Sequence, residues 1–301
     1  MLYNKIGNSE LKVSQIGLGA MSLTQGQQPV NQYIVDQSLD MGINYLDTAD
    51  LYDKGENEIL IGKLLQGDRD KWILASKVGN KWNQTGEGWT WDPSKSNIIS
   101  SVEKSLSRLK TDYLDLYQLH GGTIDDPFDD IIDAFETLAS QGKIRYYGVS
   151  SIRPNVFQKY IAQSNIISNM MQFSLLDQRP KTYLAEFEKS NVSIISRGAL
   201  AQGQLVGKTA GNYLGYTQDQ VLQVQRKADQ VCRELGITTL AYALKFPLLH
   251  GVVCSSLIGI RTKAQINELK SALLDMESLS KENYLPILNI LPQNEYTQHR
   301  F

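Results

Sequence analysis

The sequence predicts a closed (β/α)8 barrel, and three observations lead to that prediction. Short apolar segments alternate with segments of helical period along nearly the whole chain, which is typical of a parallel sheet covered by helices. Eight such strand–helix units can be counted, and eight units in 301 residues favour one closed barrel over an open sheet. No linker or low-complexity segment interrupts the pattern, so we expect residues 1–301 to form a single domain.

The expected strands are short apolar runs bounded by Gly, Asp, Ser or charged residues, as buried parallel strands usually are. They cover residues 16–18, 44–46, 72–76, 113–118, 144–149, 170–173, 192–195 and 252–255. Residues 2–5 and 11–14, on either side of Gly7-Asn8, predict an N-terminal β-hairpin that plugs the bottom of the barrel.

Two helix starts can be read from capping signals. Asp92-Pro93 and Asp126-Pro127 each place a capping side chain before a proline, a residue that the first helical position tolerates. The first of these helices is expected to run to Lys110. A third apolar stripe, at helical spacing, predicts a helix over residues 221–235.

Composition and charge exclude several classes of protein. Hydrophobic residues make up 42% of the chain and charged residues 21%, as in ordinary globular proteins. The 30 Lys and Arg against 32 Asp and Glu give a net charge of −2, which leaves no basic field for nucleic acid. No apolar run reaches the roughly 18 residues of a membrane span, and no secretory signal begins the chain. Cys232 and Cys254 have no metal or redox spacing. We therefore expect a cytoplasmic protein with no metal, membrane or nucleic-acid partner, and the sequence leaves its oligomeric state open.

Four ionisable side chains lie at the carboxyl ends of predicted strands, where a barrel builds its active site. Asp47 follows the second strand, and Tyr52 lies in the next loop. Lys77 follows the third strand and His120 the fourth. Alone, each has a structural explanation, as a loop cap, a solvated lysine or a buried histidine. Because they come from three successive strands, together they predict a catalytic group.

The chemistry of this group suits the reduction of a carbonyl. An unperturbed phenol, with a pKa of about 10, is a weak acid, and a neighbouring ammonium group strengthens it by stabilising the phenolate. The phenol can then protonate an oxygen that gains charge, while an imidazole hydrogen-bonds the same oxygen. No side chain supplies a hydride, so a cofactor must supply it.

Four segments of the chain carry characteristic motifs. They are residues 42–52 (GINYLDTADLY) with Asn57-Glu58 and Gly62, residues 108–120 (RLKTDYLDLYQLH), residues 142–150 (GKIRYYGVS) and residues 171–173 (MQF). In these segments and in their order, the sequence resembles the aldo-keto reductase family, in its bacterial general form, over about residues 2–271. The resemblance implies a (β/α)8 barrel with Tyr52 as the general acid and Lys77 as its activating partner. It further implies that Asp47 is the counter-ion of the lysine and that His120 orients the carbonyl.

The resemblance also implies NADPH as the cofactor, lying extended across the barrel rim. Ser150 and Gln172 would hold the nicotinamide carboxamide. Arg261 and Thr262 would meet the 2′-phosphate, because an arginine fork suits a phosphate better than a hydroxyl. NADPH is therefore favoured over NADH, the alternative being that Arg261 and Lys263 are solvated charges. The full expected set is Ser150, Ser151, Gln172, Arg197, Gly198, Leu200, Gly259, Arg261, Thr262, Gln265 and Glu268.

Three positions depart from the family pattern. Ser151 stands where the family often has asparagine, and Arg197 stands where many members stack a tyrosine on the nicotinamide. Leu269 follows Glu268 at the adenine site, where asparagine is common. A guanidinium plane can also stack on an aromatic ring, so Arg197 is still expected at the nicotinamide. None of these departures touches the four catalytic positions.

Two glycine-rich segments come close to nucleotide-binding motifs without matching them. Residues 17–22 begin like a dinucleotide fingerprint, yet Ser22 stands in place of the third glycine. Residues 203–209 are one residue too short between their glycines for a P-loop. This second segment lies in a long interval, residues 198–217, that we expect to pass over the cofactor.

Another long interval, residues 79–91, contains Trp82, Trp89 and Trp91 among polar residues and glycines. Above the rim of a barrel, such side chains can form walls for an apolar substrate. The alternative is that the tryptophans pack the loop onto the barrel.

The sequence therefore predicts an NADPH-dependent oxidoreductase that reduces aldehydes or ketones, with a small carbonyl compound as its partner. The alternative is an NADP(H)-binding regulatory or scaffold protein with little turnover, because the fold resembles that of potassium-channel β-subunits. A metal-dependent barrel enzyme is disfavoured, since histidine occurs only at positions 120, 250 and 299.

Overall fold

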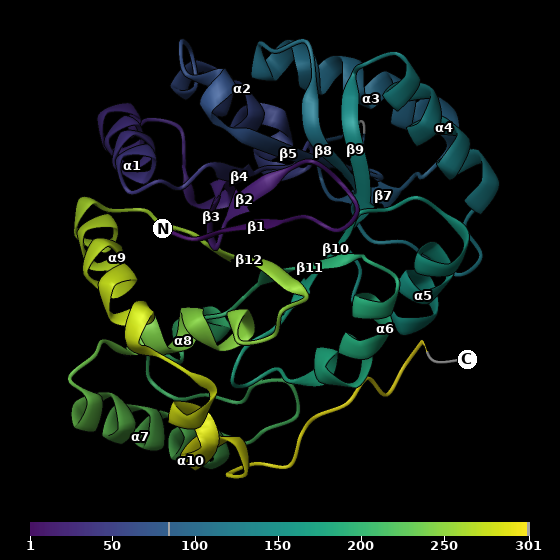
Figure 1. Ribbon diagram of the computed structural model, residues 1–301. Helices are drawn as coiled ribbons and strands as arrows, with labels where there is room; N and C mark the ends of the chain where they lie inside the picture. Colours follow the sequence, from purple (N-terminus) through teal and green to yellow (C-terminus); the bar gives the residue numbers. More distant parts are fainter. Residues whose placement is uncertain (84, 300–301) are drawn as a thin grey trace.

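Eight parallel strands close into a barrel in the computed structural model, which describes residues 1–83 and 85–299 (Figure 1). In chain order they are β3 (Ile16–Gly19), β4 (Tyr45–Asp47), β5 (Ile73–Val78), β8 (Leu114–Leu119), β9 (Ile144–Val149), β10 (Ser168–Gln172), β11 (Ser193–Arg197) and β12 (Val253–Ile258). Each strand pairs with the next, and β12 pairs with β3 to complete the circle. The predicted barrel is confirmed, and every expected strand is present with its ends shifted by three residues or fewer.

Helices cover the outside of this barrel (Figure 1). They are α1 (Gln28–Asp40), α2 (Glu56–Leu64), α3 (Lys95–Leu109), α4 (Phe128–Ser140), α5 (Pro154–Gln163), α6 (Leu184–Lys189), α8 (Thr239–Leu248) and α9 (Lys263–Asp275). The predicted α7 (Gln218–Leu235) precedes α8, which was not predicted. Seven of the ten residues of α8 are buried, and a helix buried on nearly all sides shows no amphipathic period. No helix of the described part is both long and apolar enough to cross a bilayer.

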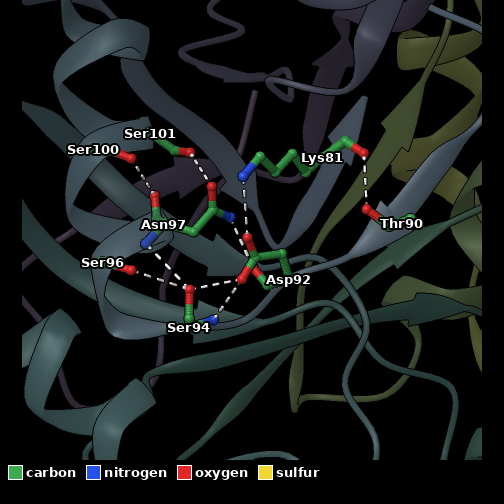
Figure 2. Close-up of polar contacts among 8 residues, drawn as sticks. All are labelled: Lys81, Thr90, Asp92, Ser94, Ser96, Asn97, Ser100 and Ser101. Atoms are coloured by element: carbon green, nitrogen blue, oxygen red, sulfur yellow. Dashed lines mark hydrogen bonds and ion pairs between the residues drawn. The ribbon is translucent and has the colours of Figure 1, made fainter. Parts of the chain in front are cut away.

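The start of α3 differs from the prediction, as Figure 2 shows. The capping residue is Ser94, whose hydroxyl accepts a hydrogen bond from the Asn97 N–H at 3.3 Å. The Asp92 carboxylate accepts hydrogen bonds from the Ser94 hydroxyl, at 2.6 Å, and from the Ser94 N–H. At α4, the Asp126 carboxylate accepts from the Thr123 N–H instead of capping the helix. Both aspartates therefore organise the loop before the helix, and the predicted helix starts were too early.

The N-terminal hairpin is also present and lies at the bottom of the barrel. Strands β1 (Tyr3–Lys5) and β2 (Lys12–Ser14) pair antiparallel. Ile6, Leu11 and Val13 are buried in one apolar cluster with barrel-interior residues, including Tyr45 and Leu116. The hairpin thus closes one end of the barrel, which leaves the carboxyl ends of the strands as the open end.

Candidate active site

The register of neighbouring strands brings the candidate catalytic side chains together. Asp47, the last residue of β4, pairs with Ala75 of β5. Lys77 lies two residues further along β5, so it faces the same side of the sheet as Ala75. Gln118 of β8 pairs in register with Lys77, and His120 directly follows that strand.

Tyr52 is held by a turn with uncommon backbone angles. It begins the short 3-10 turn η2 (Tyr52–Gly55), and its N–H donates to the Ala49 carbonyl at 3.1 Å. The next three residues, Asp53, Lys54 and Gly55, have φ angles of 49°, 56° and 88°. Residues with a Cβ rarely adopt this left-handed region, so contacts elsewhere must offset the cost of the turn. The fold thereby specifies where the phenol lies.

The ammonium group of Lys77 is the centre of the hydrogen-bond network. Lys77 is fully buried, and its Nζ lies 2.5 Å from Asp47 Oδ2, 2.8 Å from the Thr48 carbonyl oxygen and 3.2 Å from Tyr52 Oη. An ammonium group has three N–H donors, so each has one acceptor here. Since Lys77 donates to the phenol oxygen, the phenol proton is left free for another acceptor.

Charge pairing opposes the effect of burial on Lys77 and Asp47. Burial alone would lower the pKa of Lys77, but the attraction of Asp47 and Tyr52 outweighs burial, and the pKa lies above its ordinary value. Burial raises the pKa of Asp47 against the opposing effects of the Lys77 ammonium and the Gln118 amide, which donates to Asp47 Oδ1 at 3.2 Å. At 2.5 Å in a buried site, we take the Asp47–Lys77 pair to be charged at neutral pH.

His120 lies beside Tyr52 as a neutral imidazole. The two rings are 6.0 Å apart and meet edge to face at 83°. Burial, with the positive charges of Lys77 and Arg197, lowers the pKa of His120 to about 3. Its backbone N–H donates to the Val78 carbonyl at 2.7 Å, and its buried Nδ1 has no hydrogen-bond partner among the described residues. A neutral imidazole carries one N–H and can donate a hydrogen bond to a substrate oxygen.

Two cavities meet at these side chains. The first encloses about 630 Å³ and is lined by Lys77, His120 and Ser150, among others. The second encloses about 610 Å³ and is lined by Asp47 and by residues that follow β11 and β12. Residues common to both linings are Met21, Tyr52, Met170 and Arg197. The phenol therefore lies where the two cavities join.

Most of the predicted cofactor residues line these cavities. The second cavity includes Gln172, Arg197, Gly198, Leu200, Gly259, Arg261 and Gln265, and the first includes Ser150, Ser151 and Arg197. Thr262 caps α9, its hydroxyl accepting the Gln265 N–H at 3.2 Å. Glu268, further along α9, is not among the described lining residues of either cavity.

Ser151, one of the three departures from the family pattern, contacts its own loop and the neighbouring strand β10. Ser151 donates its N–H to Asn169 Oδ1 at 3.0 Å, and its hydroxyl accepts the Arg153 N–H at 3.2 Å. This hydroxyl therefore stabilises its own loop.

Lys263 lies over the Tyr33 ring at 4.7 Å, whereas Arg261 is exposed at the start of α9 with no ion pair in the described parts of the chain. An exposed guanidinium at a helix N-terminus suits a phosphate group.

Several lining residues were missed by the sequence analysis. The segment set aside as a failed dinucleotide fingerprint lines the second cavity through Gly19, Met21 and Ser22. This segment approaches β12 closely, because a Cβ placed on Gly259 would lie 2.2 Å from Ser22 Oγ. The glycine at position 259 was the available signal for that contact. Gln202 and Gly203 also line the second cavity, and both lie in the interval 198–217 that was expected to pass over the cofactor.

The tryptophan-rich interval is a hairpin, with strands β6 (Asn80–Trp82) and β7 (Trp89–Trp91). The Trp82 indole N–H donates to the Leu51 carbonyl at 3.1 Å, directly before Tyr52. The Trp91 indole N–H donates to Asp126 at 2.8 Å, and Trp89 is 55% exposed. None of the three tryptophans is among the described residues that line the two cavities, so their role in substrate binding stays a prediction.

The C-terminal tail lines the first cavity, although it had no pattern in the sequence. After α10 (Leu285–Leu288), the chain returns past α6 toward α5 (Figure 1). The His299 carbonyl accepts the Asn155 N–H at 2.9 Å, and Asn294 Oδ1 accepts the Gln178 N–H at 3.0 Å. Residues 295–299 form part of the cavity lining. The tail therefore helps to shape the space beside His120.

The fold is thus a closed (β/α)8 barrel of the enzyme kind, with a buried carboxylate–ammonium–phenol network at its open end. The chain belongs to the Aldo/keto reductase family, whose model matches residues 15–287. It is 43% identical to the uncharacterized oxidoreductase YqkF of Bacillus subtilis, covering 100% of both chains. Enzymes of this family use NAD(P)H.

Solved structures of aldo-keto reductases also match the chain. The chain superposes on the aldo-keto reductase AKR11C1 of Bacillus halodurans with 42% identity and full coverage of both chains, at a TM-score of 0.91 for the holo form. The TM-score for the apo form is 0.84. The glycerol dehydrogenase AKR11B4 of Gluconobacter oxydans gives 0.83 at 25% identity, covering 96% of this chain and 94% of that one.

Proposed function

We propose that the chain, as a single barrel domain, is an NADPH-dependent reductase that converts aldehydes or ketones to alcohols. The observation that carries the proposal is the Lys77 ammonium, which lies 2.5 Å from Asp47 and 3.2 Å from the Tyr52 oxygen, where two cavities meet. One cavity then holds the carbonyl compound and the other the cofactor. NADPH, when bound, supplies the hydride that the carbonyl carbon accepts.

The residues of the chain supply the proton. Tyr52 donates its phenolic proton to the carbonyl oxygen as that oxygen gains charge, and Lys77 stabilises the phenolate that remains. His120 donates a hydrogen bond to the same oxygen, which orients the carbonyl and stabilises the developing charge. A proton from solvent restores the phenol after the alcohol leaves. Asp47 holds the ammonium group in place throughout.

Cofactor binding is assigned to the second cavity and, for the carboxamide end, to the part of the first cavity that Ser150 lines. Gln172 and Ser150 would hold the carboxamide, and Arg197, which lines both cavities, would stack on the nicotinamide. Arg261 and the first turn of α9 would hold the 2′-phosphate. The likeness to the holo form of the Bacillus halodurans enzyme, at a TM-score of 0.91 against 0.84 for the apo form, supports a cavity already shaped for a cofactor.

A panel of aldehydes and ketones, assayed by the loss of NADPH absorbance, tests the proposal directly. We expect turnover of at least one carbonyl class and little turnover with NADH at equal concentration. NADPH binding without turnover of any carbonyl would favour the regulatory or scaffold alternative instead.

Replacing Arg261 by alanine should weaken NADPH binding about 10- to 100-fold, because charge-assisted hydrogen bonds to phosphate contribute roughly 1.5–3 kcal/mol. NADH, which has no 2′-phosphate, should bind nearly as before. Fluorescence titration of both cofactors measures the two changes. Lys63→Ala on α2 is a matched control, because its charge lies outside the described linings of both cavities. Equal weakening of NADPH and NADH would contradict the assignment.

The rate of reduction should show no inflection near pH 6.5. The pKa of His120 lies near 3, so the imidazole stays neutral from pH 5 to 8 and can donate throughout. The measurement is kcat at saturating NADPH, which removes any contribution from titration of the cofactor phosphate. An acid limb with a midpoint near 6.5 that disappears in His120→Gln would show that the histidine is charged in the working enzyme.

A further inference from the structure

The first cavity carries more positive than negative charge. Its described lining contains four cationic side chains and one carboxylate, which are Lys77, Arg153, Arg179, Arg197 and Glu295. Two of these cations are already neutralised by buried carboxylates. Lys77 pairs with Asp47 at 2.5 Å, and Arg179 contacts both oxygens of Asp177 at 2.7 Å. The remaining two cations are Arg153 and Arg197.

Of these two arginines, Arg153 is the one that lines only the first cavity, which is assigned to the substrate. Arg197 lines both cavities and is assigned to the nicotinamide, whereas Arg153 lines only the first. Neither arginine has an ion pair within residues 1–83 and 85–299. Arg153 is half-buried, and a guanidinium in that position favours an anion as its partner.

Hydrogen bonds hold both the backbone N–H of Arg153 and one N–H of its guanidinium group. Its N–H donates to Ser151 Oγ at 3.2 Å, and it is the residue that precedes α5. Its Nη1 donates to the Gly122 carbonyl, in the loop after β8 that also carries His120. A guanidinium has five N–H donors, so this contact orients the fork and leaves other donors for a ligand. The arrangement ties the arginine to the loop that orients the carbonyl.

We propose that Arg153 binds a carboxylate or phosphate group on the substrate, so that the preferred substrates are short anionic aldehydes or ketones. This inference rests on the proposed function. The carbonyl end lies at Tyr52 and His120, and the anionic end lies at Arg153 within the same cavity.

Matched substrate pairs test the proposal. Succinic semialdehyde and its methyl ester differ by a carboxylate against a neutral ester, and glyceraldehyde 3-phosphate and glyceraldehyde differ by a phosphate. We expect kcat/KM for the anionic member of at least one pair to exceed that of its neutral partner by about tenfold or more, mainly through a lower KM. The two pairs distinguish a carboxylate site from a phosphate site.

The variant Arg153→Gln should bring the anionic-to-neutral ratio of kcat/KM close to one. Arg153→Lys should keep an intermediate ratio, because a lysine retains the charge but loses the planar fork. Arg226→Gln removes an exposed charge from α7, outside the described cavity linings, and should leave the ratio unchanged. NADPH affinity, measured for each variant, reports whether the fold is intact.

Two results would overturn the inference. One is equal kcat/KM within both substrate pairs for the unmodified protein. The other is a ratio that Arg153→Gln and Arg153→Lys leave unchanged although both bind NADPH. Failure of the proposed function looks different, since no carbonyl compound, anionic or neutral, would then be reduced.

Discussion

Replacing Tyr52 by phenylalanine should lower kcat for carbonyl reduction by about 10²- to 10⁴-fold, the usual contribution of a positioned general acid. The substitution removes the hydroxyl that Lys77 contacts at 3.2 Å and keeps the ring that packs edge-on against His120. NADPH binding should change little, because only the proton donor is lost. Stopped-flow or steady-state loss of NADPH absorbance, together with a fluorescence titration, measures the two quantities separately.

Tyr146→Phe is the matched control for this variant. The Tyr146 hydroxyl accepts the Glu10 N–H at 3.2 Å, at the closed end of the barrel beside the N-terminal hairpin. Its loss should leave kcat within about twofold, since a surface hydrogen bond far from the chemistry has little effect. Full turnover in Tyr52→Phe would remove the phenol from its proposed role, whatever the control shows.

The barrel and the meeting of Asp47 with Lys77 could both be predicted, because both follow from strand period and parallel pairing. Strand period and parallel pairing determine that a side chain two residues beyond Ala75 faces the same side as Asp47. The carboxyl ends of all eight strands then lie at one rim. The sequence pattern did not predict the residues that hold the catalytic side chains in place. One of them is Gln118, whose amide donates to the second oxygen of Asp47.

Features that depend on contacts between distant segments were not predictable. The Trp82 indole contacts the Leu51 carbonyl only because the hairpin after β5 folds back over the loop after β4. The C-terminal tail is held beside the cavity because its His299 carbonyl accepts a hydrogen bond from the Asn155 N–H. That N–H lies in the first turn of α5, where no carbonyl of the same helix can accept it. Neither contact leaves a periodic signal in the sequence. Single hydrogen bonds, from a side chain or from a backbone N–H in the first turn of a helix, hold these loops in place.

Replacing Lys77 by methionine should destabilise the protein by about 3–5 kcal/mol, the cost of leaving a buried charge without its partner. Lys77 is fully buried, and Asp47, also buried, has the lysine as its ion-pair partner at 2.5 Å. The midpoint of urea unfolding, followed by circular dichroism, measures the loss. Lys81→Met is the control, because the Lys81–Asp92 pair is exposed and 3.5 Å long, and such pairs contribute about 1 kcal/mol or less.

The double variant Asp47→Asn/Lys77→Met separates the two roles of the pair. With both charges removed, no uncompensated charge is buried, so we expect most of the lost stability to return. Activity should stay as low as in Lys77→Met, because the phenol still lacks its ammonium neighbour. Unfolding of Lys77→Met at the same urea concentration as the unmodified protein would show that Asp47 is not a buried charge. Recovery of activity in the double variant would show that Tyr52 needs no cation beside it.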